Sequence, residues 1–140
     1  WGRNANGQLG LDDQATRTAP TRVVLPAAAV AIAAGRDFSV AVLADGTVYA
    51  WGLNASGQLG IGTRQIALAL SPLQVTGVTT AVDVSAGNEH ALVLLADGTV
   101  LAWGANGAGQ LGLGDLVVRR APVATPVRGA ALIRAGGDIS

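Results

Sequence analysis

The stretch Trp51-Gly52-Leu53-Asn54-Ala55-Ser56-Gly57-Gln58-Leu59-Gly60-Ile61-Gly62 decides the fold, because near copies of it occur upstream and downstream. The copies begin at Trp1 and Trp103, so the tryptophans lie 50 (51 − 1) and 52 (103 − 51) residues apart. A recurrence of that length indicates one supersecondary unit stacked in series. The chain therefore divides into units 1–50, 51–102 and a shorter 103–140, which we expect to be parts of a single domain.

Glycines at fixed offsets make each copy of the string a turn that leaves a strand and enters a loop. A proline follows the tryptophan of each unit, at Pro20, Pro72 and Pro122, which suits the edge of a sheet. The β-branched residues just beyond each proline predict an outer strand over 21–24, 73–76 and 123–125.

The alanine-rich segment after Pro26 has the intrinsic propensity of a helix, but the repeat predicts a strand. Val30–Gly35 aligns with Val82–Gly87 and with Ala131–Gly136, and the second of these alternates apolar and polar residues as a strand does. Beyond Gly35, two strand-like runs flank Ala44-Asp45-Gly46, and two more flank Ala96-Asp97-Gly98. Asp-Gly between such runs predicts a tight primed hairpin turn.

Each unit thus holds four short antiparallel strands in about 50 residues, the size and strand number of a propeller blade. We predict an all-β chain of about two and three-quarter blades of a larger propeller. The chain contains no methionine, and an open array would leave bare strand edges. We therefore expect the remaining blades to come from a parent polypeptide or, as the weaker alternative, from self-assembly.

Composition excludes several classes of partner and chemistry. The chain is 50% hydrophobic and 13% charged, and its nine arginines balance nine acids to a net charge of zero, which argues against nucleic acid binding. There is no cysteine for disulfides, thiolate metal sites or nucleophiles. The longest apolar run, 23–34, is too short to span a bilayer, so we expect a soluble chain without a membrane partner.

The repeated order Asp-Gly-Thr-Val-x-x-Trp-Gly-x-Asn, followed by Gly-Gln-Leu-Gly and Pro-x-x-Val, resembles the repeat of the regulator of chromosome condensation family. The resemblance covers essentially the whole chain and implies a seven-bladed β-propeller. It also implies several functions: members include guanine-nucleotide exchange factors of a small GTPase, recognition modules of ubiquitin ligases, a plant ultraviolet sensor and bacterial β-lactamase inhibitors with shorter repeats. Fold alone does not select among them.

The turn after each inner strand carries an acid followed by a bulky residue. In the exchange-factor branch of the family this turn faces the GTPase, so the resemblance implies a candidate partner-binding rim made of Asp37, Phe38, Glu89, His90, Asp138 and Ile139. The alternative, which we favour, is that the acids accept hydrogen bonds from backbone N–H groups of the turn. His90, the single histidine, is expected to bond backbone between strands rather than to act in catalysis.

A further set of repeated residues is expected to be structural: Trp1, Trp51, Trp103, Gly35, Gly87, Gly136, Gly46 and Gly98. An aromatic residue at a fixed repeat position favours packing between blades. No catalytic motif or metal-ligand set occurs, so we predict no enzyme, cofactor or metal.

The leading hypothesis is a non-enzymatic protein-interaction scaffold with an unidentified protein partner. The alternatives are a nucleotide-exchange regulator of a small GTPase and, third, an inhibitor of a secreted bacterial enzyme. Abundant alanine without lysine favours a bacterial source.

Overall fold

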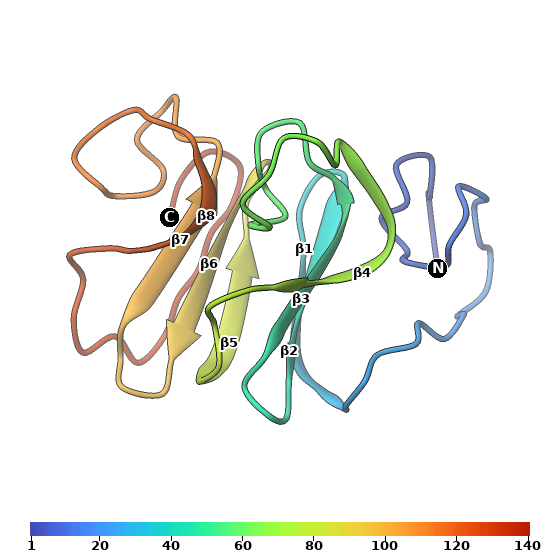
Figure 1. Ribbon diagram of the computed structural model, residues 1–140, viewed down its shortest axis with the longest axis horizontal. Helices are drawn as coiled ribbons and strands as arrows, with labels where there is room; N and C mark the ends of the chain where they lie inside the picture. Colours follow the sequence, from blue (N-terminus) through green and yellow to red (C-terminus); the bar gives the residue numbers. More distant parts are fainter.

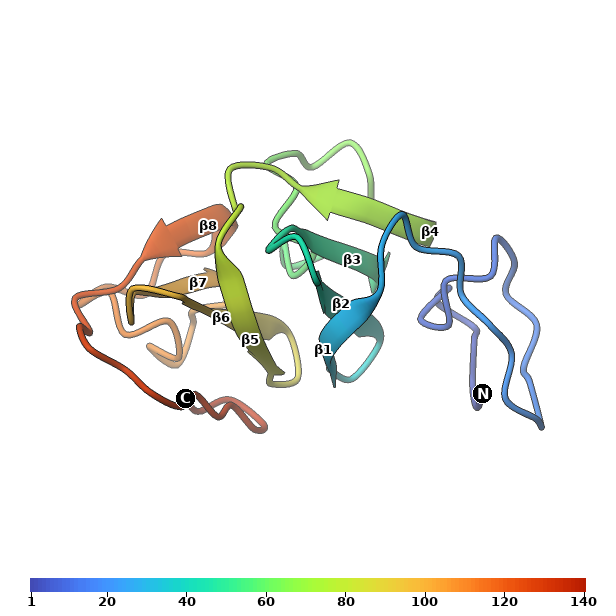
Figure 2. The same ribbon diagram turned by 90° about the horizontal axis from the view of Figure 1, so that it is seen from below.

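The computed structural model describes residues 1–140 and contains eight β-strands and no helix. The first sheet has the order β1 (Ala29–Ala34), β2 (Phe38–Leu43), β3 (Val48–Leu53) and β4 (Leu68–Val75). The second sheet repeats that order with β5 (Ala81–Ala86), β6 (His90–Leu95), β7 (Val100–Gly104) and β8 (Arg119–Ala124). All neighbours are antiparallel, and the two sheets lie side by side (Figures 1 and 2). The prediction of all-β, four-stranded blades is confirmed.

The alanine-rich segment is a strand, as the repeat predicts, and not a helix. β1 pairs with β2 through Ile32 opposite Ala41 and Ala33 opposite Val40. In the second sheet, β5 pairs with β6 in the same way, through Val84 opposite Val93. The β1 and β2 strands pack against β5, so small residues in β1 allow the two sheets to approach closely.

The hairpin between β2 and β3 exists, but its turn is not of the predicted primed type. Leu43 N–H donates to Thr47 O at 2.9 Å, and Gly46 N–H donates to Leu43 O at 2.9 Å, which leaves a three-residue loop. Gly46 has a φ of +79° and neither Ala44 nor Asp45 has a positive φ. This pattern is a type I turn followed by a left-handed glycine, the three-residue hairpin that also favours Asp-Gly.

The outer strands β4 and β8 begin before their prolines and contain them. In β4, the register with β3 shifts between Ala50 and Gly52, and Pro72 lies in the irregular part of the strand. Pro122 occupies the corresponding part of β8. Both strands are sheet edges, so the missing proline N–H breaks no inner ladder and the expected edge position is confirmed.

Two predicted strands do not form, and both lack the neighbour with which they would pair. Residues 21–24 are irregular, and only the bridge between Gly2 and Arg17 marks the place of an outer strand. Residues 131–136 have no neighbouring strand in the structure, and only Gly136 forms a bridge, to Ile139. A strand needs a partner for its backbone N–H and C=O groups, so the local sequence alone is insufficient.

The main hydrophobic core crosses the junction between the sheets. It contains 17 buried residues, among them Val40 and Val48 of the first sheet and Val84 and Val93 of the second. Burying such a side chain contributes about 1.5–3 kcal/mol, so the junction stabilises both sheets together. A smaller cluster around Leu92 and Leu111 lies on the far side of the second sheet.

No helix in the chain is long and apolar enough to cross a bilayer.

Candidate partner-binding rim

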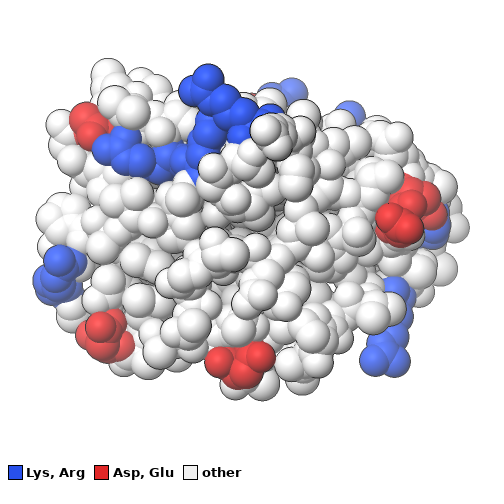
Figure 3. Space-filling model, viewed as in Figure 1, with Lys and Arg blue, Asp and Glu red and all other residues white.

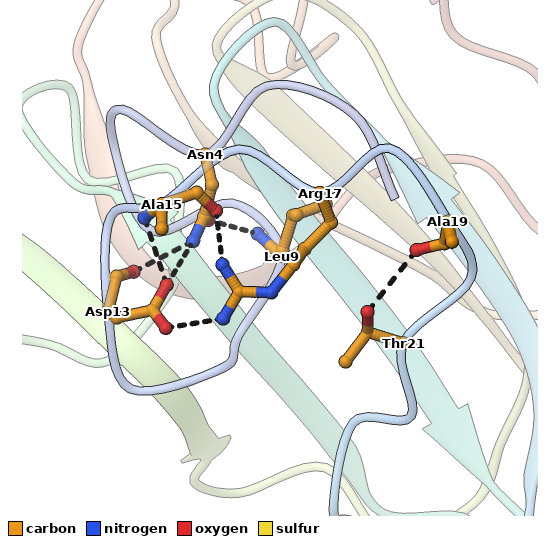
Figure 4. Close-up of polar contacts among 7 residues, drawn as sticks. All are labelled: Asn4, Leu9, Asp13, Ala15, Arg17, Ala19 and Thr21. Atoms are coloured by element: carbon orange, nitrogen blue, oxygen red, sulfur yellow. Dashed lines mark hydrogen bonds and ion pairs between the residues drawn. The ribbon is translucent and has the colours of Figure 1, made fainter.

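A buried asparagine organises each loop that follows a Trp-Gly pair. Asn4 and Asn106 are fully buried, and Asn54 nearly so. The Asn106 side-chain oxygen accepts from Leu111 N–H at 2.9 Å, and its amide nitrogen donates to Asp115 O at 2.8 Å. Asn4 makes the same pair of contacts, to Leu9 and Asp13 (Figure 4). One amide therefore closes the loop from both sides, which explains the asparagine in every copy of the string.

In the first and third of these loops, an aspartate forms an ion pair with the arginine four residues later. Arg17 pairs with Asp13, and Arg119 pairs with Asp115 at 2.6 Å. The hydrogen bond from Arg17 lowers the pKa of Asp13 below its usual value, and backbone N–H of Val117, together with Arg119, lowers the pKa of Asp115. The second loop has Thr63 in place of the aspartate, and there Asn54 donates to Ile66 O at 2.7 Å.

Trp51 and Trp103 are each hydrogen-bonded to the loop that follows the preceding Trp-Gly pair. Trp51 Nε1 donates to Gln8 O, and Trp103 Nε1 donates to Gln58 O, both at 2.9 Å. The indoles also lie on glycines of the same loops: a Cβ on Gly60 would lie 2.7 Å from Trp103 Nε1. Trp51 and Trp103 thus lie between neighbouring blades, whereas Trp1 is 73% exposed.

The spacing from a glycine to a ring three residues later recurs in two repeats, and it has a steric reason. A Cβ on Gly35 would lie 2.0 Å from Phe38 Cε1, and one on Gly87 would lie 2.1 Å from His90 Cε1. Each ring thus occupies the space that a side chain would need. Phe38 and His90 are buried, at 1% and 0% exposure, so neither reaches a partner directly.

His90 belongs to a hydrogen-bonded chain inside the protein. Its Nε2 lies 2.9 Å from Ser140 Oγ, which donates its proton to Gln110 O at 2.7 Å. The other ring nitrogen, Nδ1, is buried without a hydrogen-bond partner. Burial lowers the pKa of His90. In place of the expected bond to backbone between strands, His90 therefore contacts a serine hydroxyl, which bonds the main-chain oxygen of Gln110 in a loop.

The three acid-bearing turns form a continuous row. Arg36 N–H donates to Asn88 O at 3.1 Å, and Asn88 N–H donates to Gly137 O at 2.8 Å. The row therefore joins successive turns by backbone hydrogen bonds. Its exposed residues are Arg36, Asn88, Asp138 and Ile139.

The acids of this row bind neighbouring side chains and not turn backbone, so the favoured alternative from the sequence is wrong. Gln8 Nε2 donates to Asp37 at 3.2 Å, and Ser56 Oγ donates to Glu89 at 2.7 Å. Ser56 lies in the loop between β3 and β4 of the first sheet, whereas Glu89 lies in the turn between β5 and β6 of the second, and Gln8 occupies the equivalent loop before β1. These contacts therefore connect the turns of one blade to the loop of the blade before it. Asp138 accepts from Asn88 Nδ2 at 3.5 Å and stays exposed.

The far face of the second sheet holds an apolar hollow of about 450 Å³, lined in part by Leu92, Val100, Leu111 and Ile133. On the first sheet, β5 covers the equivalent face. No group of three or more His, Cys, Asp or Glu side chains is placed to hold a metal ion.

Successive four-stranded sheets, each bound to the loop of the one before it, define a β-propeller repeat protein, here a partial propeller. The chain belongs to the family of the regulator of chromosome condensation (RCC1) repeat, whose model matches residues 1–42, 45–94 and 97–140.

Several known proteins are similar to it. The probable E3 ubiquitin-protein ligase HERC6 of Homo sapiens is 35% identical over 87% of the chain, which spans 12% of that protein. The ultraviolet-B receptor UVR8 of Arabidopsis thaliana is 36% identical over 83% of the chain and 27% of its own length. The crystal structure of Prp20p from Saccharomyces cerevisiae superposes with a TM-score of 0.84 at 26% identity, covering 98% of this chain and 37% of that one. These relatives are eukaryotic, and the bacterial source stays a prediction.

Proposed function

We propose that this chain is a non-enzymatic protein-interaction module, and that the row of turns around Arg36, Asn88 and Asp138 meets the partner. The observation that carries the proposal is the backbone hydrogen bonding that joins these turns into one row. A rigid scaffold that holds loops in fixed positions is a common basis of protein recognition, in which a few residues supply most of the affinity.

Two kinds of side chain in the row support different roles. Phe38, His90 and Asp37 are buried and hold the turns in place. Arg36, Asn88, Asp138 and Ile139 are exposed and offer charged, amide and apolar groups to a partner. We therefore assign direct contact to the exposed residues and to the half-buried Glu89, and a supporting role to the buried ones.

Structural relatives support a protein partner. The Prp20p structure is described together with its binding properties to Gsp1p and histones, and a second structure shows yeast RCC1 (Prp20) bound to Kap60. This second relative also has a TM-score of 0.84 and covers 98% of the chain.

Photo-crosslinking tests the proposal. A photoreactive amino acid is placed at Asn88 in the row or, as a control, at Ala96, an exposed residue in the turn at the opposite end of β6. We expect a crosslinked partner from cells of the source organism with the first and not with the second. Equal crosslinking at both positions, or at neither, would contradict the proposal.

A second candidate function is the regulation of nucleotide exchange on a small GTPase. It is favoured by the similarity to Prp20p over nearly the whole chain and by that protein's described binding to Gsp1p. Release of a fluorescent guanine nucleotide from GTPases of that class is the assay. A release rate equal to the rate in buffer would reject this function and leave the interaction module intact.

A further inference from the structure

The outer edge of the second sheet borders a cleft of about 570 Å³ that is rich in arginine. Arg64 lines it from the loop before β4, and Arg119 and Arg120 line it from β8. The other lining residues are glycine, alanine and valine, and none is acidic. Three of the nine arginines of a chain with no net charge therefore meet at one place, and Figure 3 shows basic side chains gathered above β8.

The first sheet has a smaller cleft that shares two equivalent lining positions with this one, Asp12 for Gly62 and Ser71 for Ala121, and it serves as an internal comparison. Asp12 N–H donates to Leu70 O at 2.9 Å, just as Gly62 N–H donates to Arg120 O at 2.8 Å. Leu70 and Arg120 also lie on equivalent glycines, Gly7 and Gly57. The two positions are therefore the same place in successive repeats.

The chemistry of the two clefts differs. The first has a volume of about 340 Å³ and contains one acid and one base, Asp12 and Arg22. The second contains three bases and no acid. The excess of positive charge is therefore a property of the second cleft and not of the repeat in general.

Two of the three guanidinium groups in the second cleft have no acidic partner. Arg119 is paired with Asp115 at 2.6 Å. Arg120 makes two long contacts of 3.4 Å to Ala55 O, and its buried Nε has no partner. Arg64 is exposed and forms no ion pair or hydrogen bond. A buried polar group without a partner costs free energy, which a bound acceptor would recover.

We infer that this cleft binds an oxyanion side chain, a carboxylate or a phosphate, on a peptide segment of a protein partner, between Arg64 and Arg120. Planar guanidinium groups match the two oxygens of such groups and bind them more strongly than neutral donors do. The inference rests on the proposed function to the extent that the ligand belongs to a protein.

Fluorescence anisotropy with defined peptides tests it. The probes are a fluorescein-labelled decapeptide of glutamate and serine, the same peptide with phosphoserine, and a control with lysine in place of glutamate. We expect the first two to bind, the third not to bind, and the affinity to fall as salt is raised. Tighter binding of the phosphoserine peptide would identify phosphate as the preferred oxyanion, and tighter binding of the first would identify carboxylate.

Three variants locate the site. Arg64→Gln and Arg120→Leu should each weaken binding about fivefold, since an exposed ion pair supplies up to that factor. Arg22→Gln, in the smaller cleft of the first sheet, should leave the affinity unchanged. The Leu70 side chain shows that leucine fits the position of Arg120, so Arg120→Leu should fold with an unchanged or higher melting temperature.

The inference is overturned if neither anionic peptide binds, or if Arg22→Gln weakens binding as much as Arg64→Gln does. Failure here is distinct from failure of the proposed function, because crosslinking at Asn88 uses another surface residue and is measured without the peptides. A lysine peptide that binds equally well would also contradict the inference.

Discussion

Trp103 Nε1 in β7 donates a 2.9 Å hydrogen bond to the main-chain oxygen of Gln58, which lies in the loop between β3 and β4 of the other sheet. Trp51 and Gln8 repeat the contact one unit earlier. The string of residues that recurs in the sequence thus plays two parts at once. Its tryptophan donates a hydrogen bond to the preceding loop. The main-chain oxygen of its glutamine accepts a hydrogen bond from the next tryptophan. Stability in such an array comes largely from contacts between neighbouring units.

The first prediction concerns this contact. Trp103→Phe keeps an aromatic ring but removes the N–H group, and it leaves the buried Gln58 oxygen without a partner. We expect the free energy of unfolding to fall by about 1–3 kcal/mol, measured by urea denaturation. The control Trp1→Phe changes an exposed side chain and should shift the value by less than about 0.5 kcal/mol. Equal effects of the two changes would refute the role of the hydrogen bond.

The second prediction concerns the glycine beneath His90. Gly87→Ala places a methyl group 2.1 Å from the ring and 2.7 Å from Gly137 O, so backbone must move. We expect a loss of about 2–3 kcal/mol of stability. Gly136→Ala is the matched control, because nothing lies within 4 Å of a Cβ there and the φ of Gly136 is not positive. An unchanged midpoint for Gly87→Ala would show that the ring does not need this space.

The third prediction concerns pH. Burial lowers the pKa of His90 below the ordinary value of 6.5, so the unfolded chain binds a proton more readily than the folded one. The free energy of unfolding therefore has its full value above about pH 6.5. It falls as the pH decreases toward the pKa of His90 in the folded state.

The variant His90→Phe tests this assignment, since Phe38 fills the equivalent place above Gly35. Its melting temperature should lose the decrease between pH 6.5 and 5 that the parent chain shows. The lowered pKa values of Asp13 and Asp115 change the stability only when the pH falls toward or below their ordinary value of 3.8, which is outside this pH range. A variant with the same pH profile as the parent would assign the effect to other groups.

The fourth prediction concerns the buried asparagine of the third loop. Asn106→Asp keeps the acceptor for Leu111 N–H but removes the donors to Asp115 and Val117. It also buries a carboxylate, so we expect a loss of about 2–3 kcal/mol of stability. Asn6→Asp is the comparison, because the Asn6 side chain forms no hydrogen bond in the structure. Hydrogen exchange of the Leu111 amide would show whether the loop opens.

Repetition made much of the fold predictable. Aligning Val30–Gly35 with Val82–Gly87 identified β1 as a strand against its helical propensity, and the strand-like runs before the two Asp-Gly turns form β2 and β6. The outer strands were located, although their starts were placed too late. The turn type was wrong, because Asp-Gly suits both a two-residue and a three-residue loop, and only hydrogen bonds distinguish them.

The candidate rim was less predictable. The sequence indicated which residues follow each inner strand, but not that Gln8 and Ser56 of the preceding loops would bind the acids. It did not show that Phe38 and His90 face inward over glycines. The three-residue spacing from glycine to the ring was a signal that could have indicated this packing. The asparagine of each string was visible as part of the repeat, yet its closing of the loop depends on carbonyl groups several residues away.

The sequence by itself determined the repeat length, the strand content and the glycines that its turns require, because these depend on local periodicity and backbone conformation. Tertiary structure decided which strands form, which side chains are buried and where charge gathers. Residues 21–24 and 131–136 lack strand partners, and Arg120 replaces Leu70 at an otherwise equivalent junction. Each of these outcomes depends on groups brought together from distant parts of the chain, and pairing across that distance is not encoded in any one segment.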